Sequence, residues 1–498
     1  MTPAQDLQAS KKAQAAGSAD EPPSLFEREG KPSPKYFVPL ALQHVMAAII
    51  GIITPAMIVG NACGLPSEDS AMLIQAAMLF SGIVTLLQAH PLFGRIGSGL
   101  PVITGASFAF VPVLNSIGAA DGIAAVIGAQ FVGGFVAMAF ALFLKPLRKL
   151  FPPVVMGTVV FCIGLSLYSV AVGYMAGGNG AADFGSAQNW IVALITLAFC
   201  IFFGNFCKGV LKLGSLLFGL LAGYAVALAL GMVDFSGIAG ATWVSLPRFL
   251  PFGITFRPDA IVSLGSMFII AAVEMMGDFS ATTNGAMDRE PRFRELKGGI
   301  LCEGFASTIG ALFGGLPTST FAQNVGITTS TRVVSKRVFA CAAGILIVAG
   351  LMPKFAAVLN TIPMAVIGGA TLTVFGSITM TGIKILTRDG LSARKGTIAG
   401  TSIALGMGIS MVSGALAGPG IPEWVTSIFG GSAIVVTTLL AIVLNLVLPD
   451  PDGEKAVGVV EEDEELGIDG AALAADKAAA AAVAASKVGE LATESKGA

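Results

Sequence analysis

Long apolar stretches separated by short polar loops cover residues 37–448 of the chain. Because about 20 helical residues cross the hydrocarbon core of a bilayer, this region accommodates up to about fourteen spans. We expect them near residues 37–58, 69–89, 101–117, 119–143, 152–173, 189–206, 212–232, 259–286, 294–315, 317–331, 336–352, 355–378, 397–414 and 423–447. The pattern predicts an all-α polytopic membrane protein.

The composition agrees with this fold class. Hydrophobic residues make up 54% of the chain and charged residues 12%, whereas a soluble globular protein carries roughly 25% charged residues. The mean hydropathy is +0.81. The net charge of -2 does not describe a folded surface, because a run of acids occupies residues 461–465. No basic surface for nucleic acid is visible, so the lipid bilayer is the expected environment.

Lysine and arginine residues test the number and order of the spans, since they collect in alternate, cytoplasmic loops. With fourteen spans, 17 basic residues fall in loops on one side of the membrane and three fall on the other, namely Arg248, Arg257 and Lys354. The basic side is expected to be cytoplasmic. Both termini then lie in the cytoplasm, and the protein is a multi-pass protein of the plasma membrane.

A weak internal repeat relates the two halves. Residues 100–104 (Leu-Pro-Val-Ile-Thr) match residues 316–320 (Leu-Pro-Thr-Ser-Thr), and residues 152–157 resemble residues 363–368. Chance similarity between apolar segments is the alternative. Because seven spans per half is an odd number, a true repeat makes the second half inverted relative to the first.

The best repeat copies lie in spans 3 and 10, which are both expected to be broken. Residues 316–332 are polar and interrupted by Pro and Gly, and a break at membrane depth persists only where it lines a cavity or a ligand site. We expect extended pieces at 102–105 and 318–321, and half-helices that start near Ser107 and Gln323. The positive N-terminal ends of the half-helices would face each other near the midplane.

The ends of the chain differ from the membrane domain, which we assign to residues 36–448. Residues 1–35 and the acidic, Ala-rich residues 449–498 are low-complexity segments, and we expect disordered cytoplasmic tails. The first 35 residues lack the apolar core of a signal peptide. His44 and His90 are too few and too far apart for a metal site, so neither a metal nor another cofactor is expected. No nucleophile or metal constellation indicates an enzyme.

Three acidic residues interrupt apolar spans. Glu274 lies well inside span 8, where a carboxylate needs a function or a partner, and Asp278 is one turn later on the same face. Two carboxyl groups that face one cavity favour a proton-coupled binding site. Hydrogen bonds to neighbouring hydroxyls or to a broken helix are the structural alternative, and Asp278 can also reach cytoplasmic water. Glu303 ties its helix to a broken one, acts in gating, or relays protons.

Polar and aromatic side chains near the breaks are candidates for substrate contacts. Gln323 presents a donor and an acceptor in one plane, which suits a heterocycle edge with adjacent N–H and C=O groups. Asn324 braces the base or the half-helix, or caps that helix. Ser107 caps the opposite half-helix, and Phe108 is a stacking wall or a core residue. His44 takes part in proton coupling or gating, or is a hydrogen-bonded structural histidine.

These residues form a recognisable pattern. The sequence Gln323-Asn324-Val325-Gly326, followed by Thr331-Arg332, resembles the signature of the nucleobase-ascorbate transporter family, also called xanthine/uracil permeases. The resemblance covers the membrane region and not the tails. It also includes Gln43-His44, the Glu274/Asp278 pair, Glu303-Gly304 and residues 320–324. One departure is Glu303, where the family usually has Asp.

The resemblance implies two inverted repeats of seven spans, a core domain (spans 1–4 and 8–11) and a gate domain (spans 5–7 and 12–14). It also implies proton symport and a homodimer. In that family the residue that matches Glu274 binds the base, and the residue that matches Gln323 contacts it from the second broken helix. A Gln at this position is similar to the purine (xanthine or urate) branch, whereas uracil-type members carry Glu.

We therefore expect a symporter that imports a purine base, most simply xanthine or urate, together with protons, by moving the core against the gate. A permease for uracil or another nucleobase is one alternative. An anion exchanger on the same architecture is another, and its site would pair half-helix N-termini with a cation rather than with Glu274.

Overall fold

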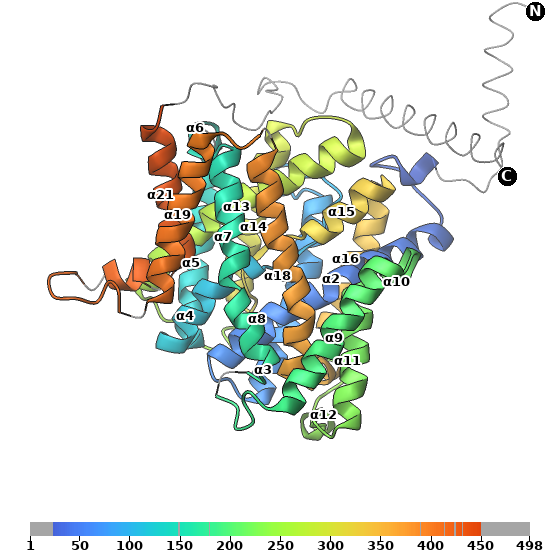
Figure 1. Cartoon of the computed structure of the whole chain (residues 1–498). Coiled ribbons are helices and arrows are strands. Elements are labelled where there is room, and N and C mark those ends of the chain that lie inside the picture. The colour runs from blue at the N-terminus through green and yellow to red at the C-terminus, as the bar shows by residue number, and fades with distance from the viewer. Residues whose placement is uncertain are drawn as a thin grey trace, which may run out of the picture.

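The computed structural model describes residues 23–147, 150–178, 180–388, 390–412, 414–422, 425–430 and 432–449. Most of this region is helical (Figure 1). By length and composition, seven helical segments within the described residues suffice to cross a membrane, and a bent pair brings the number to eight. The seven are α2 (Pro34–Ala62), α3 (Ser67–Ala89), α5 (Ile123–Leu142), α7 (Pro153–Ser166) with α8 (Tyr168–Met175), α9 (Ala187–Phe206), α13 (Pro258–Met287) and α18 (Met364–Thr387). The predicted helical, multi-span membrane protein is thus confirmed.

Shorter elements complete the described part of the chain. The bent pair consists of α16 (Lys336–Gly350) and α17 (Pro353–Asn360). The other elements are η1 (Pro23–Leu25), η2 (Phe108–Phe110), α4 (Val111–Asp121), α6 (Leu144–Leu147), α10 (Gly209–Leu213), α11 (Ser215–Ala229), α12 (Ser236–Ala239), α14 (Phe293–Ala311), α15 (Ala322–Thr331), α19 (Ala393–Met411), η4 (Thr426–Gly430) and α21 (Ala433–Val447).

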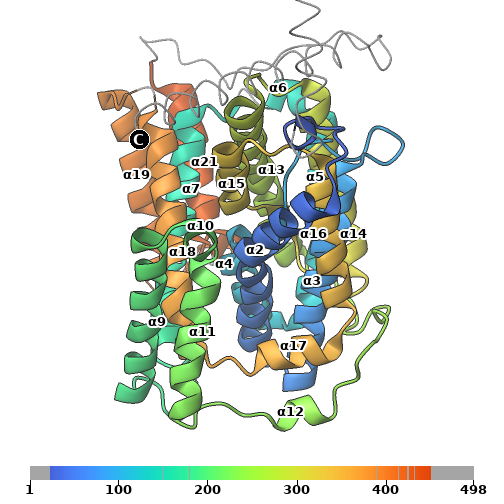
Figure 2. The same ribbon diagram turned by 90° about the vertical axis from the view of Figure 1, so that its right-hand side faces the viewer.

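The helices form two groups that stand side by side (Figure 2). The first group contains α2, α3, α4, α5, α13, α14, α15 and α16. The second group contains α7, α8, α9, α11, α18, α19 and α21. Helix α13 contacts α7 and α21 across the boundary, and α2 contacts α11. Helices α13 and α2 therefore form much of the surface that the first group presents to the second.

Local sequence features determine where these helices begin and how closely they pack. Helix α13 begins with Pro258 and carries Asp259 in its first turn, as a helix N-terminus favours. In the second group, a Cβ atom at Gly164 of α7 would lie 2.2 Å from the hydroxyl of Thr379 on α18. Glycine at this position thus lets α7 and α18 approach closely, as small residues do between membrane helices.

Two short strands pair with each other within the first group of helices. Strands β1 (Thr104–Ala106) and β2 (Thr318–Thr320) pair antiparallel, with Gly105 opposite Ser319. Helices η2 and α4 follow β1, and α15 follows β2. A Cβ atom at Gly105 would lie 2.8 Å from the ring of Phe321, so the close packing at this position of β1 requires glycine. The extended pieces predicted at 102–105 and 318–321 are confirmed to within two residues.

The N-terminal tail differs from the prediction. Residues 1–22 and 450–498 lie outside the described part of the chain, but residues 23–33, which were predicted to be disordered, pack on the helical body. The carbonyl of Leu25 accepts hydrogen bonds from the backbone N–H groups of Val334 and Ser335, and Leu25 is only 6% exposed. The low-complexity composition gave no sign of Leu25 and Phe26, whose packing against the core favours order in this segment.

The twelfth predicted span, at 355–378, is also misplaced. Helix α17 bends by 82° from α16, and α18 begins at Met364 and extends to Thr387. Pro353 and Pro363 each stand at the start of a helix, where proline is tolerated, and each disfavours a helical residue before it. The apolar pattern alone did not separate α17 from α18.

Candidate substrate site at the two broken helices

Two carboxyl groups hold strand β2 from one side. The hydroxyl of Thr320 donates a hydrogen bond to Asp278 of α13 at 2.5 Å, and the hydroxyl of Thr318 donates to Glu303 of α14. Side chains two residues apart on a strand point to the same face, so both acids act on one face of β2. The strand is thus fixed to two different helices.

Glu303 belongs to a buried polar cluster that also includes α3. The amide nitrogen of Gln88 donates to Glu303 Oε1 at 3.2 Å and to the carbonyl of Gly299 at 3.0 Å. The amide oxygen of Gln88 accepts a hydrogen bond from the backbone N–H of Ser98. Because Glu303 is 3% exposed and hydrogen-bonded through both oxygens, its geometry favours joining α3, α14 and β2 over direct substrate contact.

Glu274 differs from Asp278 and Glu303 in its hydrogen bonding. It lies one turn before Asp278 on α13, and its Oε2 atom is shielded from solvent without a hydrogen-bond partner among the described residues. It borders a cavity of about 10 Å³, which holds roughly one water molecule. The other lining residues are Phe151, Met156, Val159, Val160, Ile270 and Val273. A buried carboxylate oxygen without a partner is costly, so Glu274 is poised to accept a donor that the protein itself does not supply.

Asn324 and His44 form a contact between α15 and α2. The Asn324 side chain donates to the His44 carbonyl at 3.0 Å, and its nitrogen lies 3.1 Å from His44 Nδ1. Both residues are almost fully buried, and the His44 ring packs 4.8 Å from the ring of Phe339. Asn324 does not cap α15, because the N-cap position is Phe321 and no side chain caps it. Asn324 instead braces the half-helix against α2.

Gln323, the residue before Asn324, is not part of this buried contact. Its side chain is exposed, and its amide has no hydrogen-bond partner within the part of the chain that the structure describes. It follows Thr320 by three residues, while Glu274 precedes Asp278 by one turn. Gln323 and Glu274 therefore lie on two helices, α15 and α13, that contact each other.

Ser107 and Phe108 occupy the first broken helix. The Ser107 hydroxyl accepts a hydrogen bond from the backbone N–H of Ala109 at 3.2 Å, so Ser107 caps η2 as predicted. Phe108 is 5% exposed, and its ring meets the ring of Phe375 on α18 edge to face at 5.1 Å. Because α18 belongs to the second group of helices, Phe108 lies where the two groups meet.

The structure thus places the eight predicted site residues around two strands and their adjoining helices, with different surroundings. Glu274 and Gln323 have unused hydrogen-bonding capacity, whereas Asp278, Glu303 and His44 are engaged with the protein. Asn324 is engaged through its amide nitrogen, while its buried amide oxygen has no partner among the described residues. Sequence reasoning did not identify the partners Thr318, Thr320 and Gln88. The hydroxyls at alternate positions of the predicted extended piece were the available signal.

The described residues contain no group of three or more His, Cys, Asp or Glu side chains that could hold a metal ion. The arrangement suits reversible binding of a planar polar molecule, with a carboxylate on one helix and an amide on another. Polar sites at broken helices within the bilayer are typical of secondary transporters. The fold and the site together define a membrane transporter of this class.

The chain belongs to the xanthine/uracil permease family. The family model, described as "Permease family", matches residues 36–415. The chain is 35% identical to the xanthine permease XanQ of Escherichia coli (strain K12) over 448 residues, which cover 85% of this chain and 94% of that protein. It is 38% identical to the uric acid permease PucJ of Bacillus subtilis (strain 168), covering 82% and 91% of the two chains. It is accordingly a permease and not an enzyme.

A solved structure gives an independent view of the fold. The transmembrane domain of the cyanobacterium bicarbonate transporter BicA aligns with a TM-score of 0.52 over 84% of this chain and 99% of that domain. The two sequences are 16% identical. The similarity therefore shows a shared fold and carries no information about substrate.

Proposed function

We propose that this protein is a proton-coupled symporter that imports a purine base, with xanthine or urate as the best candidates. The observation that carries the proposal is the buried, unpartnered Oε2 atom of Glu274 on α13, a helix that packs against α15, which carries the exposed Gln323. The names of XanQ and PucJ support a purine as the substrate.

The chemistry of a purine base fits these two side chains. A carboxylate accepts two hydrogen bonds, so Glu274 suits two ring N–H groups, and charge-assisted bonds of this kind are strong. The planar amide of Gln323 donates to a ring carbonyl while accepting from the adjacent N–H. Phe108, at the boundary between the helix groups, offers an aromatic edge or face to the ring.

The same carboxyl group couples the purine to a proton in this proposal. Glu274 exchanges a proton with water when the site opens and holds the base when it closes. Asp278 and Glu303 hold β2 in place through Thr320 and Thr318. Glu274 is the most suitable proton carrier because its hydrogen bonds are not needed to support the strand.

Substrate binding requires the two groups of helices to separate. The cavity beside Glu274, at about 10 Å³, is far smaller than the roughly 300–1,000 Å³ of typical ligand pockets. It lies between α13 of the first group and α7 of the second. We propose that the first group is the core (spans 1–4 and 8–11), that the second is the gate (spans 5–7 and 12–14), and that transport moves one against the other.

The finer architecture is part of the same proposal. It comprises fourteen spans in two inverted repeats of seven, with both termini in the cytoplasm. The antiparallel pairing of two strands that occupy matching positions in the two halves supports the inverted repeat. The 17-to-3 distribution of basic residues supports the orientation. A homodimer, expected from the family, completes this arrangement.

Two other functions make different predictions. Uracil or another nucleobase would use the same site with another hydrogen-bond pattern. An anion exchanger on the same architecture is the second alternative, and the shared fold with BicA does not decide for or against it. The Glu274 carboxyl oxygen without a partner requires a hydrogen-bond donor, such as a ring N–H group, rather than an inorganic anion.

Reconstituted proteoliposomes test the proposal. Labelled xanthine is offered with an inside-alkaline pH gradient, and unlabelled urate, hypoxanthine, guanine, adenine, uracil or bicarbonate is added as a competitor. We expect accumulation that a protonophore abolishes, with urate or another oxidised purine as the strongest competitor. Accumulation that ignores the pH gradient would refute proton coupling. Competition by uracil or bicarbonate alone would refute the purine assignment.

A further inference from the structure

An ordered segment before the first membrane helix packs on one end of the first group of helices. In the proposed membrane orientation this end is cytoplasmic. We call residues 23–30 the N-terminal strap. The strap holds residues 334–336, which lie just after α15, by main-chain hydrogen bonds. The carbonyls of Leu25 and Arg28 accept from this loop, and the Gly30 carbonyl accepts from the hydroxyl of Ser335.

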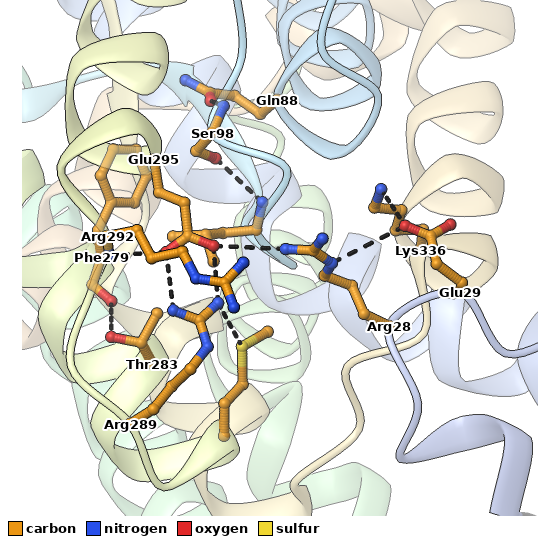
Figure 3. Close-up of polar contacts among 12 residues, drawn as sticks. Arg28, Glu29, Gln88, Ser98, Phe279, Thr283, Arg289, Arg292, Glu295 and Lys336 are labelled. Carbon is orange, nitrogen blue, oxygen red and sulfur yellow. Dashed lines mark hydrogen bonds and ion pairs between the residues drawn. The ribbon is translucent and has the colours of Figure 1, made fainter. Parts of the chain in front are cut away.

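Ion pairs join the strap to two further elements (Figure 3). Arg28 lies 3.3 Å from Glu295 at the start of α14, and Lys336 at the start of α16 lies 2.5 Å from Glu29. The Glu295 side chain is only 6% exposed and is also paired with Arg289 at 2.6 Å. Loss of Arg28 would therefore remove one of the charges that compensate a nearly buried carboxylate.

The protonation of Glu29 agrees with a formed contact. Burial alone would raise the pKa of Glu29. The hydrogen bond from Lys336 and the positive charges of Lys336 and Arg28 outweigh burial and hold the pKa below its ordinary value. The Glu29 carboxylate is therefore charged at neutral pH.

The strap also depends on a tight turn. The backbone N–H of Gly30 donates to the carbonyl of Glu27 at 3.0 Å. A Cβ atom at Gly30 would lie 1.9 Å from the carbonyl oxygen of Ser24, which no side-chain adjustment can relieve. Alanine at position 30 would thus open the strap without changing any charge.

The element that most needs this support is α15, which carries Gln323. It has ten residues, four of which are buried, and it contacts α13 and α2. The strap is continuous with α2 and holds the loop after α15. At membrane depth, His44 of α2 holds Asn324 of α15. Helix α2 therefore contacts α15 near its start, and the strap contacts the loop that follows its end.

We propose that the N-terminal strap is a positioning element of the transport site, which fixes α15 and with it Gln323. In this proposal the strap contributes to transport by positioning α15, and residues 2–22 do not contribute to that positioning. The link to substrate affinity rests on the proposed contact between Gln323 and the purine. The effect of the strap on the order of α15 does not depend on that contact.

Hydrogen exchange and transport kinetics together test this inference on the full-length protein. The test variants are Gly30→Ala, Arg28→Ala and a deletion of residues 2–30. The matched controls are Glu27→Ala, at an exposed position of the same segment, and a deletion of residues 2–22. In each test variant we expect amide exchange in residues 322–331 to rise by about tenfold or more, because local opening becomes easier. The KM for xanthine should rise severalfold with a smaller change in the maximal rate, and the controls should match the unmodified protein.

Amide exchange and the KM together distinguish a failure of the strap proposal from a failure of the proposed Gln323 contact. Faster exchange in α15 with an unchanged KM would support the strap and overturn Gln323 as a substrate contact. Unchanged exchange in α15 for Gly30→Ala and Arg28→Ala, at normal membrane abundance, would overturn the strap whatever the transport rate.

Discussion

The Oδ2 atom of Asp278 lies 2.5 Å from the hydroxyl oxygen of Thr320, so the second acid on the inward face of α13 is occupied by strand β2. Glu274, one turn earlier on the same face, has a buried oxygen without such a partner among the described residues. Two acids that look equivalent in the sequence therefore have different surroundings. One supports the broken helix, and the other remains for the substrate and the proton.

Replacing Glu274 by Gln should abolish transport. The amide keeps the size of the side chain but cannot accept two N–H groups as a carboxylate does, and it cannot cycle a proton. The measurement is xanthine uptake by energised cells at matched membrane abundance. Glu68→Gln, at an exposed position at the start of α3, is the matched control and should transport normally. Accumulation by Glu274→Gln at the level of this control would remove Glu274 from the mechanism.

Replacing Thr318 or Thr320 by Val should destabilise the protein. Each change leaves a buried carboxylate without its hydroxyl donor, at a cost of roughly 1–3 kcal/mol. Thermal unfolding in detergent should shift downward for both variants. Thr371→Val is the control, because the Thr371 hydroxyl bonds only within its own helix. If all three variants unfold at the same temperature, the two carboxylates do not anchor β2.

Replacing Gln323 by Glu should change substrate selectivity. The substitution exchanges a donor for an acceptor and leaves a mismatch of roughly 1–3 kcal/mol against the purine edge. We expect the affinity for xanthine and urate to fall by about tenfold or more. Folding should be preserved, since the Gln323 side chain is exposed. Inhibition constants for both purines that equal those of the unmodified protein would argue against the contact.

The orientation in the membrane can be tested with single cysteines in a background where all six native cysteines are replaced by Ser. Cysteines at Glu68 and Ala182 should react with an impermeant thiol reagent from outside intact cells, and a cysteine at Glu290 should not. All three positions are exposed, so access depends on the side of the membrane. The expectation follows from the distribution of basic residues. Labelling at position 290 in intact cells would reverse the topology.

Much of the fold could be predicted because the bilayer imposes strong rules on the sequence. The apolar lengths located the helices, and the repeated Leu-Pro motif located the two strands at Thr104 and Thr318. Span 12 was misplaced because α17 is apolar enough to resemble part of a span. Pro353 marks the bend between α16 and α17, and Pro363 marks the break between α17 and α18. The strap was missed because one buried leucine carries no periodic signal.

For the site, the sequence identified the residue types and not their partners. Glu274, Asp278 and Glu303 stood out because charges are rare in apolar spans. Which of the three is unpartnered depends on contacts between segments far apart in the chain, such as Gln88 with Glu303. The hydroxyls of Thr318 and Thr320, at alternate positions of the predicted extended piece, were the available signal for two of the partners.

The most direct test of the central claim is equilibrium binding of labelled xanthine to the purified protein. Three proteins are compared: unmodified, Glu274→Gln and Glu68→Gln. We predict saturable binding to the unmodified protein and to Glu68→Gln, displaced by urate and not by bicarbonate. Binding to Glu274→Gln should be weaker by at least about tenfold, because charge-assisted hydrogen bonds are lost. Equal xanthine affinity for all three proteins would contradict the assignment of Glu274 as the group that holds the purine.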